Sequence, residues 1–204
     1  MQIIDALNAT RDETVPLFAL GDADLARTYG AGKWSVRYVL HHLADAETVL
    51  FERIRRVLSE GRRVIWAFDP DAWARALDYP TRPLALSRDM YLSARAGVIH
   101  YAALHYDRDG HLEWIHSETG VRTLRDEFDK VTSHNARHLT QIRTALKTGT
   151  PQEGEQGDDV TSLGVGGAVD CSRRLHHREL RAGTEQPALH SILRGPFIGQ
   201  GSLL

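Results

Sequence analysis

The strongest constraint on the fold is an apolar stripe that runs through residues 36–57. Its apolar residues recur every three or four positions, which is the spacing that places side chains on one face of an α-helix. They are Val36, Val39, Leu40, Leu43, Ala46, Leu50, Ile54 and Val57. Ser35 precedes the stripe as an N-cap, and Gly61 follows it as a stop signal. The segment predicts a long helix that must bury one face.

Three further segments also have helical periodicity. Residues 2–20 carry apolar side chains at helical spacing, and Pro16 is expected to kink or shorten this helix. Residues 84–104 form the next candidate, after a loop with one short helical turn in "VIWAFDPDAWARAL". The last helix, 123–149, opens with the capping-box pattern "TLRD". Nothing in residues 1–150 alternates as strands do, so the sequence predicts an all-α, antiparallel four-helix bundle without a sheet.

The composition changes after residue 150. Nine of the 17 glycines fall in the last 54 residues, and "GEQGDDVTSLGVGGAVD" has neither a helical nor a strand period. We therefore expect a bundle domain over 1–150 and a disordered, glycine-rich extension over 151–204. His176 and His177 in this extension are adjacent, so on a helix they would point apart and chelate poorly.

Charge and composition exclude several classes of function. The 204 residues include 25 basic and 27 acidic ones without a dense basic run, which argues against a nucleic-acid-binding protein. No apolar stretch approaches the roughly 18 residues of a membrane span. The first residues, "MQIIDALNATRDE", lack the layout of a secretion signal, so we expect a cytoplasmic protein. The single cysteine, Cys171, excludes an internal disulfide and leaves histidine and carboxylate as the candidate metal ligands.

The stretch "SHNARHLTQI" contains such candidates. His134 and His138 are four residues apart and share one helical face, and Gln141 follows three residues later. This geometry permits chelation of a metal, but an isolated pair is more often a hydrogen-bonded helix edge. A metal site requires a third ligand from another helix.

The helix over residues 36–57 offers two adjacent histidines, His41 and His42. Successive residues of a helix differ in direction by about 100°. On this helical wheel His42 lies at the edge of the apolar stripe, close to Val39 and Ala46. His41 lies on the opposite side together with Arg37, Asp45 and Glu52. We therefore expect His42 to face the other helices and His41 to face solvent.

Two motifs together resemble the DinB/YfiT-like superfamily of bacterial proteins that are regarded as metalloenzymes. "KWSVRYVLHHLADAE" matches the family's W-S-x5–6-H-L motif, and "HNARHLTQI" matches H-x3-H-x2-Q. The resemblance covers roughly residues 1–148 and implies a four-helix bundle. It implies that His42, His134 and His138 are metal ligands and that Gln141 supports them.

The resemblance also implies a chemistry. Three neutral imidazoles leave an open position on a divalent ion, as in catalytic sites. Zinc suits these ligands best, and nickel, iron and copper also accept imidazole. Members of the family use low-molecular-weight thiols such as bacillithiol, mycothiol or glutathione, so we expect a metal-activated thiol that attacks an electrophilic small molecule. Two alternatives remain open: a non-catalytic, stress-related metal-binding bundle, and a helical interaction module. A homodimer is compatible with the sequence.

Glu47 is unusual because it falls within the apolar stripe. A buried carboxylate needs a partner. Glu47 is therefore either a structural acid satisfied by an arginine, an indole or backbone donors, or a catalytic residue that accepts a proton or supports the ligands. Three arginines at helix edges either recognise a carboxylated thiol or substrate or, as is more usual, are solvated, and we expect the latter for Arg37, Arg53 and Arg137. Surface or hydrogen-bonding roles are expected for four other histidines, of which the last two could border the site: His100, His105, His111 and His116.

Overall fold

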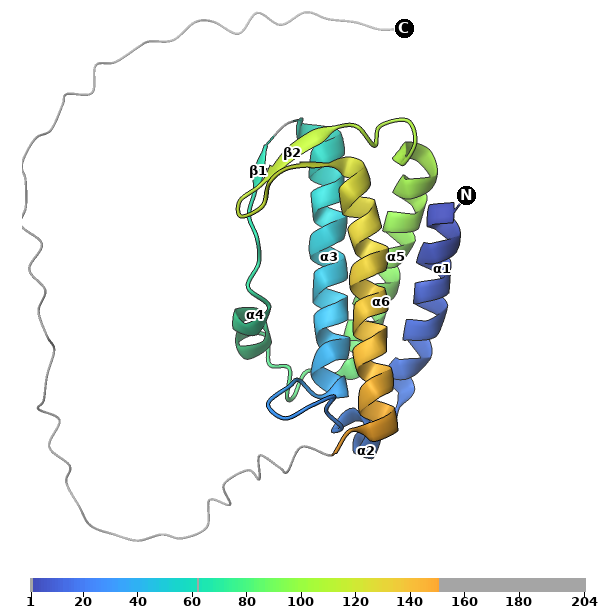
Figure 1. Cartoon of the computed structure of the whole chain (residues 1–204), viewed down its shortest axis with the longest axis vertical. Coiled ribbons are helices and arrows are strands. Elements are labelled where there is room, and N and C mark those ends of the chain that lie inside the picture. The colour runs from blue at the N-terminus through green and yellow to red at the C-terminus, as the bar shows by residue number, and fades with distance from the viewer. Residues whose placement is uncertain (1, 62, 151–204) are drawn as a thin grey trace, which may run out of the picture. The chain divides into compact units, whose positions relative to one another are not determined.

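The computed structural model describes residues 2–61 and 63–150. The predicted extension over 151–204 and the disorder assigned to it lie outside the described residues, so the domain boundary at residue 150 stays a prediction. The predicted four-helix bundle is confirmed (Figure 1). Its long helices are α1 (Gln2–Thr14), α3 (Val36–Glu60), α5 (Leu84–His105) and α6 (Leu124–Thr148).

Shorter elements connect these helices. Pro16 lies in the first turn of a 3₁₀ helix, and α1 stops at Thr14, as the sequence predicts. The other short elements are η1 (Val15–Ala19), α2 (Asp22–Leu25), β1 (Val64–Ile65), α4 (Pro70–Ala76), β2 (Glu113–His116) and β3 (Gly120–Thr123). Each helix in the described part of the chain is too short or too polar to cross a membrane.

The ends of the helices form as their residues predict. Ser35 Oγ accepts a hydrogen bond from the Tyr38 amide at 3.4 Å, which caps α3. Gly61 ends α3 with a φ of +71°, a conformation that glycine adopts without a steric penalty. At the start of α6, Thr123 Oγ1 accepts from the Asp126 amide and Asp126 Oδ2 accepts from the Thr123 amide. The capping box is therefore confirmed.

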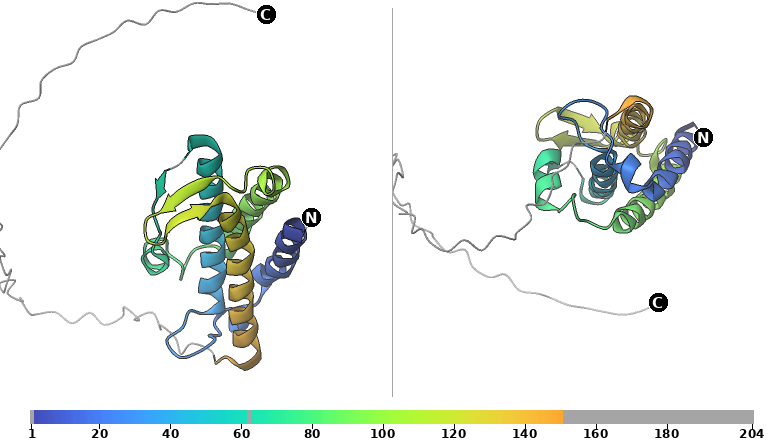
Figure 2. Two further views of the ribbon diagram at one scale, coloured as in Figure 1. Left: turned by 45° about the horizontal axis from the view of Figure 1, so that its top comes forward. Right: turned by 90° about the horizontal axis from the view of Figure 1, so that it is seen from below.

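The order and direction of the helices differ from those of a simple antiparallel bundle in which each helix reverses the one before it. His41 bonds Ser87 near the start of both α3 and α5, and Glu47 bonds Arg95 further along both helices. These contacts show that α3 and α5 run in the same direction. The connection over residues 61–83 makes this possible because it returns along the bundle and carries β1 and α4 (Figures 1 and 2). It also covers one side of α3.

Close packing joins the two parallel helices. A Cβ atom added at Gly97 would lie 2.4 Å from the end of the Phe51 ring, so the ring packs directly against the glycine backbone of α5. Two groups of buried apolar side chains fill the interior. One includes Leu7, Leu50, Ile54, Val98, Trp114 and Phe128, and the other includes Phe18, Val39, Leu40, Leu43, Tyr91 and Ile142.

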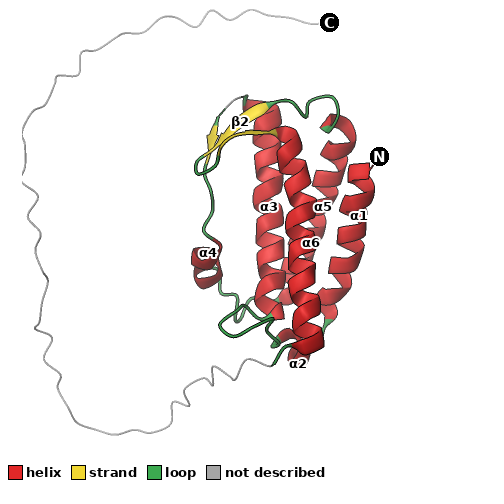
Figure 3. Cartoon of the chain, viewed as in Figure 1, coloured by secondary structure: helices red, strands yellow, loops and turns green. Residues whose placement is uncertain are grey.

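A small sheet lies at one end of the bundle (Figure 3). Its order is β1-β2-β3, with β1 parallel to β2 and β2 antiparallel to β3. The prediction that residues 1–150 contain no strand is therefore wrong. Strands of two and four residues are too short to show a reliable alternation of apolar and polar positions. Their pairing is also non-local, since Val64 pairs with Ile115.

Candidate metal centre

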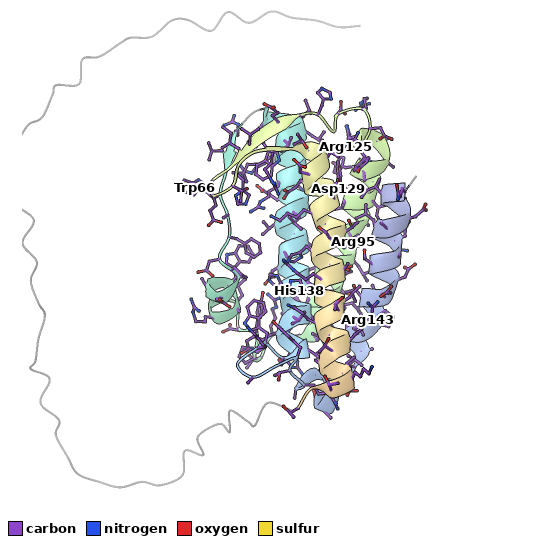
Figure 4. The ribbon with its side chains drawn as sticks, viewed as in Figure 1. Trp66, Arg95, Arg125, Asp129, His138 and Arg143 are labelled. Atoms are coloured by element: carbon purple, nitrogen blue, oxygen red, sulfur yellow. The ribbon has the colours of Figure 1, made fainter. Side chains whose placement is uncertain are left out.

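The structure brings together the three histidines that the sequence singles out. One ring nitrogen from each of His42, His134 and His138 lies within 4.8 Å of the others. His134 Nε2 is 3.2 Å from His42 Nε2 and 3.1 Å from His138 Nε2. His42 comes from α3, and the other two lie one turn apart on α6; His138 is labelled in Figure 4.

These distances fit a metal ion. A tetrahedral zinc with nitrogen ligands at 2.0–2.1 Å places those nitrogens about 3.3 Å apart. Gln141 sets the orientation of one ligand, because His138 Nδ1 lies 2.7 Å from Gln141 Oε1 and donates a hydrogen bond to it. The lone pair of His138 Nε2 is then directed to the cluster. The contact of Gln141 with a predicted ligand is thus present.

Burial keeps all three imidazoles neutral. It lowers the pKa of His42 from 6.5 to about 3, with a smaller contribution from His138. Burial likewise lowers the pKa of His134 to about 2 and that of His138 to about 4. At pH 7 the three side chains therefore offer nitrogen lone pairs rather than positive charges, as metal ligation requires.

Two aromatic rings enclose His42. Trp34 meets the imidazole edge-on with ring centroids 5.2 Å apart, and Phe68 stacks on it at 6.0 Å. Trp34 also packs against the apolar cluster that contains Val39, in keeping with its position before the N-cap. His42 is only 4% exposed, and its Nδ1 has no hydrogen-bond partner among the described residues. Packing rather than a hydrogen bond therefore fixes this ring.

The expectation that His41 faces solvent is wrong. The side chain is fully buried, and its Nδ1 lies 2.8 Å from Ser87 Oγ. Its ring also contacts Tyr79. The helical wheel failed because it compares a residue with the apolar face of its own helix. It does not include the start of α5 or the connection over residues 61–83, whose polar groups cover the other face of α3. His41 is not part of the three-histidine cluster.

Asp45 anchors this connection to α3. Arg82 Nη1 donates to both carboxylate oxygens of Asp45 at 3.1 Å, and Tyr79 Oη donates to Oδ2 at 2.7 Å. Burial raises the pKa of Tyr79 far above its usual range, and the bond to Asp45 adds to this effect, so the phenol keeps its proton. Tyr79 in turn meets Trp34 edge-on. A buried polar network thus supports one wall of the histidine cluster.

Glu47 lies in a different part of the bundle interior. Arg95 donates to its two oxygens at 2.6 and 2.9 Å, and Arg95 also donates to the Leu7 carbonyl at 2.8 Å. Burial raises the pKa of Glu47, while the hydrogen bond and charge of Arg95 oppose that rise. Glu47 does not belong to the three-histidine cluster. Its contacts favour the structural alternative, and its catalytic role stays a prediction.

Of two other polar side chains, Arg53 contradicts its sequence prediction and His116 agrees with its own. Arg53 was expected to be solvated, but it is 2% exposed and donates to Glu127 Oε1 and the Trp66 carbonyl. That expectation is wrong because Glu127 reaches Arg53 from a distant part of the chain. His116 is buried in β2, and its Nδ1 accepts a hydrogen bond from the Glu118 amide at 3.2 Å, in line with a hydrogen-bonding role.

Sequence reasoning missed two neighbours of the histidine cluster, the cationic Lys130 and the aromatic Phe68. Lys130 precedes His134 by one helical turn, and its ammonium makes no hydrogen bond or ion pair with residues 2–61 or 63–150. Burial lowers the pKa of Lys130. The four-residue spacing could have identified it. Phe68, which stacks on His42, lies in an irregular segment and gives no periodic signal.

Comparison with known proteins agrees with this arrangement. The family model described as "DinB superfamily" matches residues 6–142. The "Putative metal-dependent hydrolase OB0413" of Oceanobacillus iheyensis is 25% identical over 128 residues, which are 63% of this chain and 73% of the relative. The "Putative metal-dependent hydrolase YfiT" of Bacillus subtilis is 30% identical over 95 residues, which are 45% of this chain and 52% of the relative.

A solved structure shares the fold of this chain. YfiT from Bacillus subtilis, described as a probable metal-dependent hydrolase with an unusual four-helix bundle topology, matches with a TM-score of 0.64. The two chains are 23% identical, and the match covers 70% of this chain and 82% of YfiT. The likeness shows a shared fold. Because the family model spans most of the bundle and both histidine motifs up to Gln141, the chain belongs to the DinB superfamily.

Proposed function

We propose that this protein is a divalent-metal-dependent enzyme that transfers a low-molecular-weight thiol to an electrophilic small molecule. The observation that carries the proposal is the convergence of three neutral histidines, His42, His134 and His138, with separations that fit one ion. The names of the relatives support dependence on a metal. The thiol comes from the resemblance of the two motifs to thiol-using members of the family.

The side chains have distinct roles in this proposal. His42, His134 and His138 would hold the ion, which we expect to be zinc, with nickel or iron as alternatives. An ion with three neutral ligands keeps its full charge and lowers the pKa of a thiol at its open position by several units. Gln141 holds the His138 ring in the ligating orientation. Trp34 and Phe68 exclude water from the buried side of His42.

Thiol transfer requires no general acid for its leaving group, whereas hydrolysis normally does. Among the described residues, the group that could hold an ion contains histidine alone. Hydrolysis of an ester or amide requires a proton for the leaving group, which a general acid normally supplies. In thiol transfer a carbon–sulfur bond forms, a leaving group such as halide departs with its electron pair, and the thiol proton passes to solvent. Metal-dependent hydrolysis remains the second candidate because it is the activity in the relatives' names.

Two cations on α6 support an anionic thiol. Lys130 and Arg137 flank His134 on either side in the sequence, and each is close enough to lower its pKa. Within the described residues, neither side chain forms an ion pair with an acid. Glu127 acts on Lys130 through its charge without forming an ion pair, and a thiol that carries carboxylates would add a direct partner for both cations. We therefore expect Lys130→Gln to raise the KM for such a thiol and to leave the metal content unchanged.

The proposal is tested with protein purified without a histidine tag. Elemental analysis should find about one divalent ion per chain. A panel of bacillithiol, mycothiol and glutathione with 1-chloro-2,4-dinitrobenzene should then show turnover that requires both metal and thiol, that chelation abolishes and that zinc restores. Bound metal without turnover would favour the non-catalytic binding protein. Ester hydrolysis without thiol would favour the hydrolase, and a chain that binds no metal would contradict both enzymes.

A further inference from the structure

A cavity of about 640 Å³ lies beside the metal centre, between α3 and the segment over residues 66–73. This volume is in the range of sites that bind small molecules. Val49 and Thr48 contribute one wall from α3, and Trp66, Phe68 and Trp73 contribute the other. Figure 4 shows Trp66 beyond α3, on the side of the bundle where β1 and α4 lie.

Phe68 connects this cavity to the histidine cluster. Its ring stacks on His42 with an angle of 20° between the planes, and it also lines the cavity. Trp73 meets Phe68 edge-on with centroids 5.1 Å apart. A molecule that lies against Phe68 in the cavity is therefore next to a ligand of the metal centre.

The lining selects a flat, uncharged group. Trp66 is 79% exposed, and it lines the cavity together with Phe68 and Trp73, so this wall is a contiguous aromatic patch of the kind that marks binding sites. Among the described residues, the charged ones that line the cavity are Glu52 and Asp69, and both are already engaged. Glu52 pairs with Arg56, and Asp69 Oδ1 accepts hydrogen bonds from two amides at the start of α4. The described lining residues therefore offer no cation to an anionic group.

We propose that this cavity binds the uncharged aromatic body of the electrophilic substrate and holds its reactive carbon toward the histidine cluster. This inference rests on the proposed function and names the class of electrophile. The two substrates then bind to surfaces of different chemistry. The anionic thiol lies near the cations Lys130 and Arg137 on α6, and the uncharged aromatic electrophile lies between Trp66 and Trp73. The aromatic rings act as specificity-determining residues because offset and edge contacts favour a planar partner.

The first experiment measures binding without catalysis. Equilibrium dialysis of the protein against 1,3-dinitrobenzene, an unreactive aromatic probe, is carried out without thiol. We expect saturable binding to one site, a Kd at least tenfold higher for Trp73→Ala and Trp66→Ala, and an unchanged Kd for Leu104→Ala. Leu104 is a matched control because it is a large apolar residue, 51% exposed, on α5 and outside the cavity. Non-saturable binding, or equal Kd values in all variants, would overturn the inference.

The second experiment measures selectivity in turnover. With 1-chloro-2,4-dinitrobenzene, the thiol sulfur bonds to the ring carbon and chloride leaves with its electron pair. Trp73→Ala should raise the KM for this substrate at least tenfold, with normal metal content, and leave the KM for iodoacetamide unchanged because that electrophile has no ring. If the unmodified protein and Trp73→Ala had the same KM for 1-chloro-2,4-dinitrobenzene as well as for iodoacetamide, the inference would be overturned while the proposed function would stand. If Trp73→Ala weakened binding of the aromatic probe but no thiol gave turnover, the aromatic binding site would be supported and the proposed function would be contradicted.

Discussion

At the scale of single residues, adjacent side chains of one helix have different roles. His42 contributes to the three-histidine cluster, whereas His41 forms a hydrogen bond with Ser87 in the first turn of α5. Both are buried, so exposure does not distinguish them. What distinguishes them is the neighbouring helix that each one faces: α6 carries two more imidazoles, and α5 carries a hydroxyl group.

This difference predicts opposite effects of two substitutions. His42→Ala leaves two of three ligands, so we expect metal affinity to fall by more than about a hundredfold, beyond the usual effect of losing a group that only supports a ligand. His41→Ala should keep the metal stoichiometry and destabilise the fold by about 1–3 kcal/mol, because buried polar partners lose a hydrogen bond. Elemental analysis and thermal unfolding of both variants measure the two effects. Equal metal loss in both would contradict the assignment of His42 as the ligand.

At the scale of elements, one buried ion pair joins three helices. Glu47 on α3 pairs with Arg95 on α5, and Arg95 also bonds the Leu7 carbonyl and Thr10 Oγ1 on α1. Removing one partner of a buried pair leaves the other charge uncompensated. The pair therefore positions α1 and α5 against the helix that carries His42.

Replacement of the carboxylate tests whether Glu47 is structural or catalytic. Glu47→Gln should lower the free energy of unfolding by about 3–5 kcal/mol because the Arg95 charge stays buried without its counter-charge. The kcat of the folded fraction should not change. Urea unfolding and steady-state kinetics at low temperature, with metal content as the control, separate these effects. A large fall in kcat at normal stability would restore the catalytic role that the sequence left open.

At the scale of the whole molecule, the histidines make stability depend on pH. In the unfolded chain they titrate near pH 6.5, but in the folded protein burial lowers the pKa of His42 to about 3 and those of His41 and His138 to about 4. Below pH 6.5 the unfolded chain therefore binds protons that the folded protein does not. The native state loses stability as the pH falls through this window.

We expect the metal-free protein to lose stability between pH 6.5 and pH 4. Each histidine that stays neutral contributes up to about 1.4 kcal/mol per pH unit to this loss. Zinc should raise the free energy of unfolding at pH 7 by mass action, and because the ligands stay neutral it should remain bound below pH 6. Urea unfolding with and without zinc across this pH range is the measurement. A flat profile for the metal-free protein would mean that the imidazoles are not held neutral.

Local features of the fold could be predicted from the sequence because they depend on neighbouring residues. The stripe over residues 36–57, the cap at Ser35 and the capping box at Thr123 each act within one or two helical turns. The positions of His134 and Gln141 relative to His138 are fixed by the same helical repeat. The helical periodicity and the caps therefore predicted the bundle, and the histidine spacing within the helices predicted the candidate ligands.

The tertiary structure decided whatever depends on segments far apart in the chain. The parallel course of α3 and α5, the pairing of Val64 with Ile115 and the burial of His41 all follow from the long connection over residues 61–83. The choice of Arg95 as the partner of Glu47 follows from the approach of two helices. A helical period specifies which face of a helix is apolar, but contacts across the bundle decide what covers the other faces and therefore which polar residues are buried.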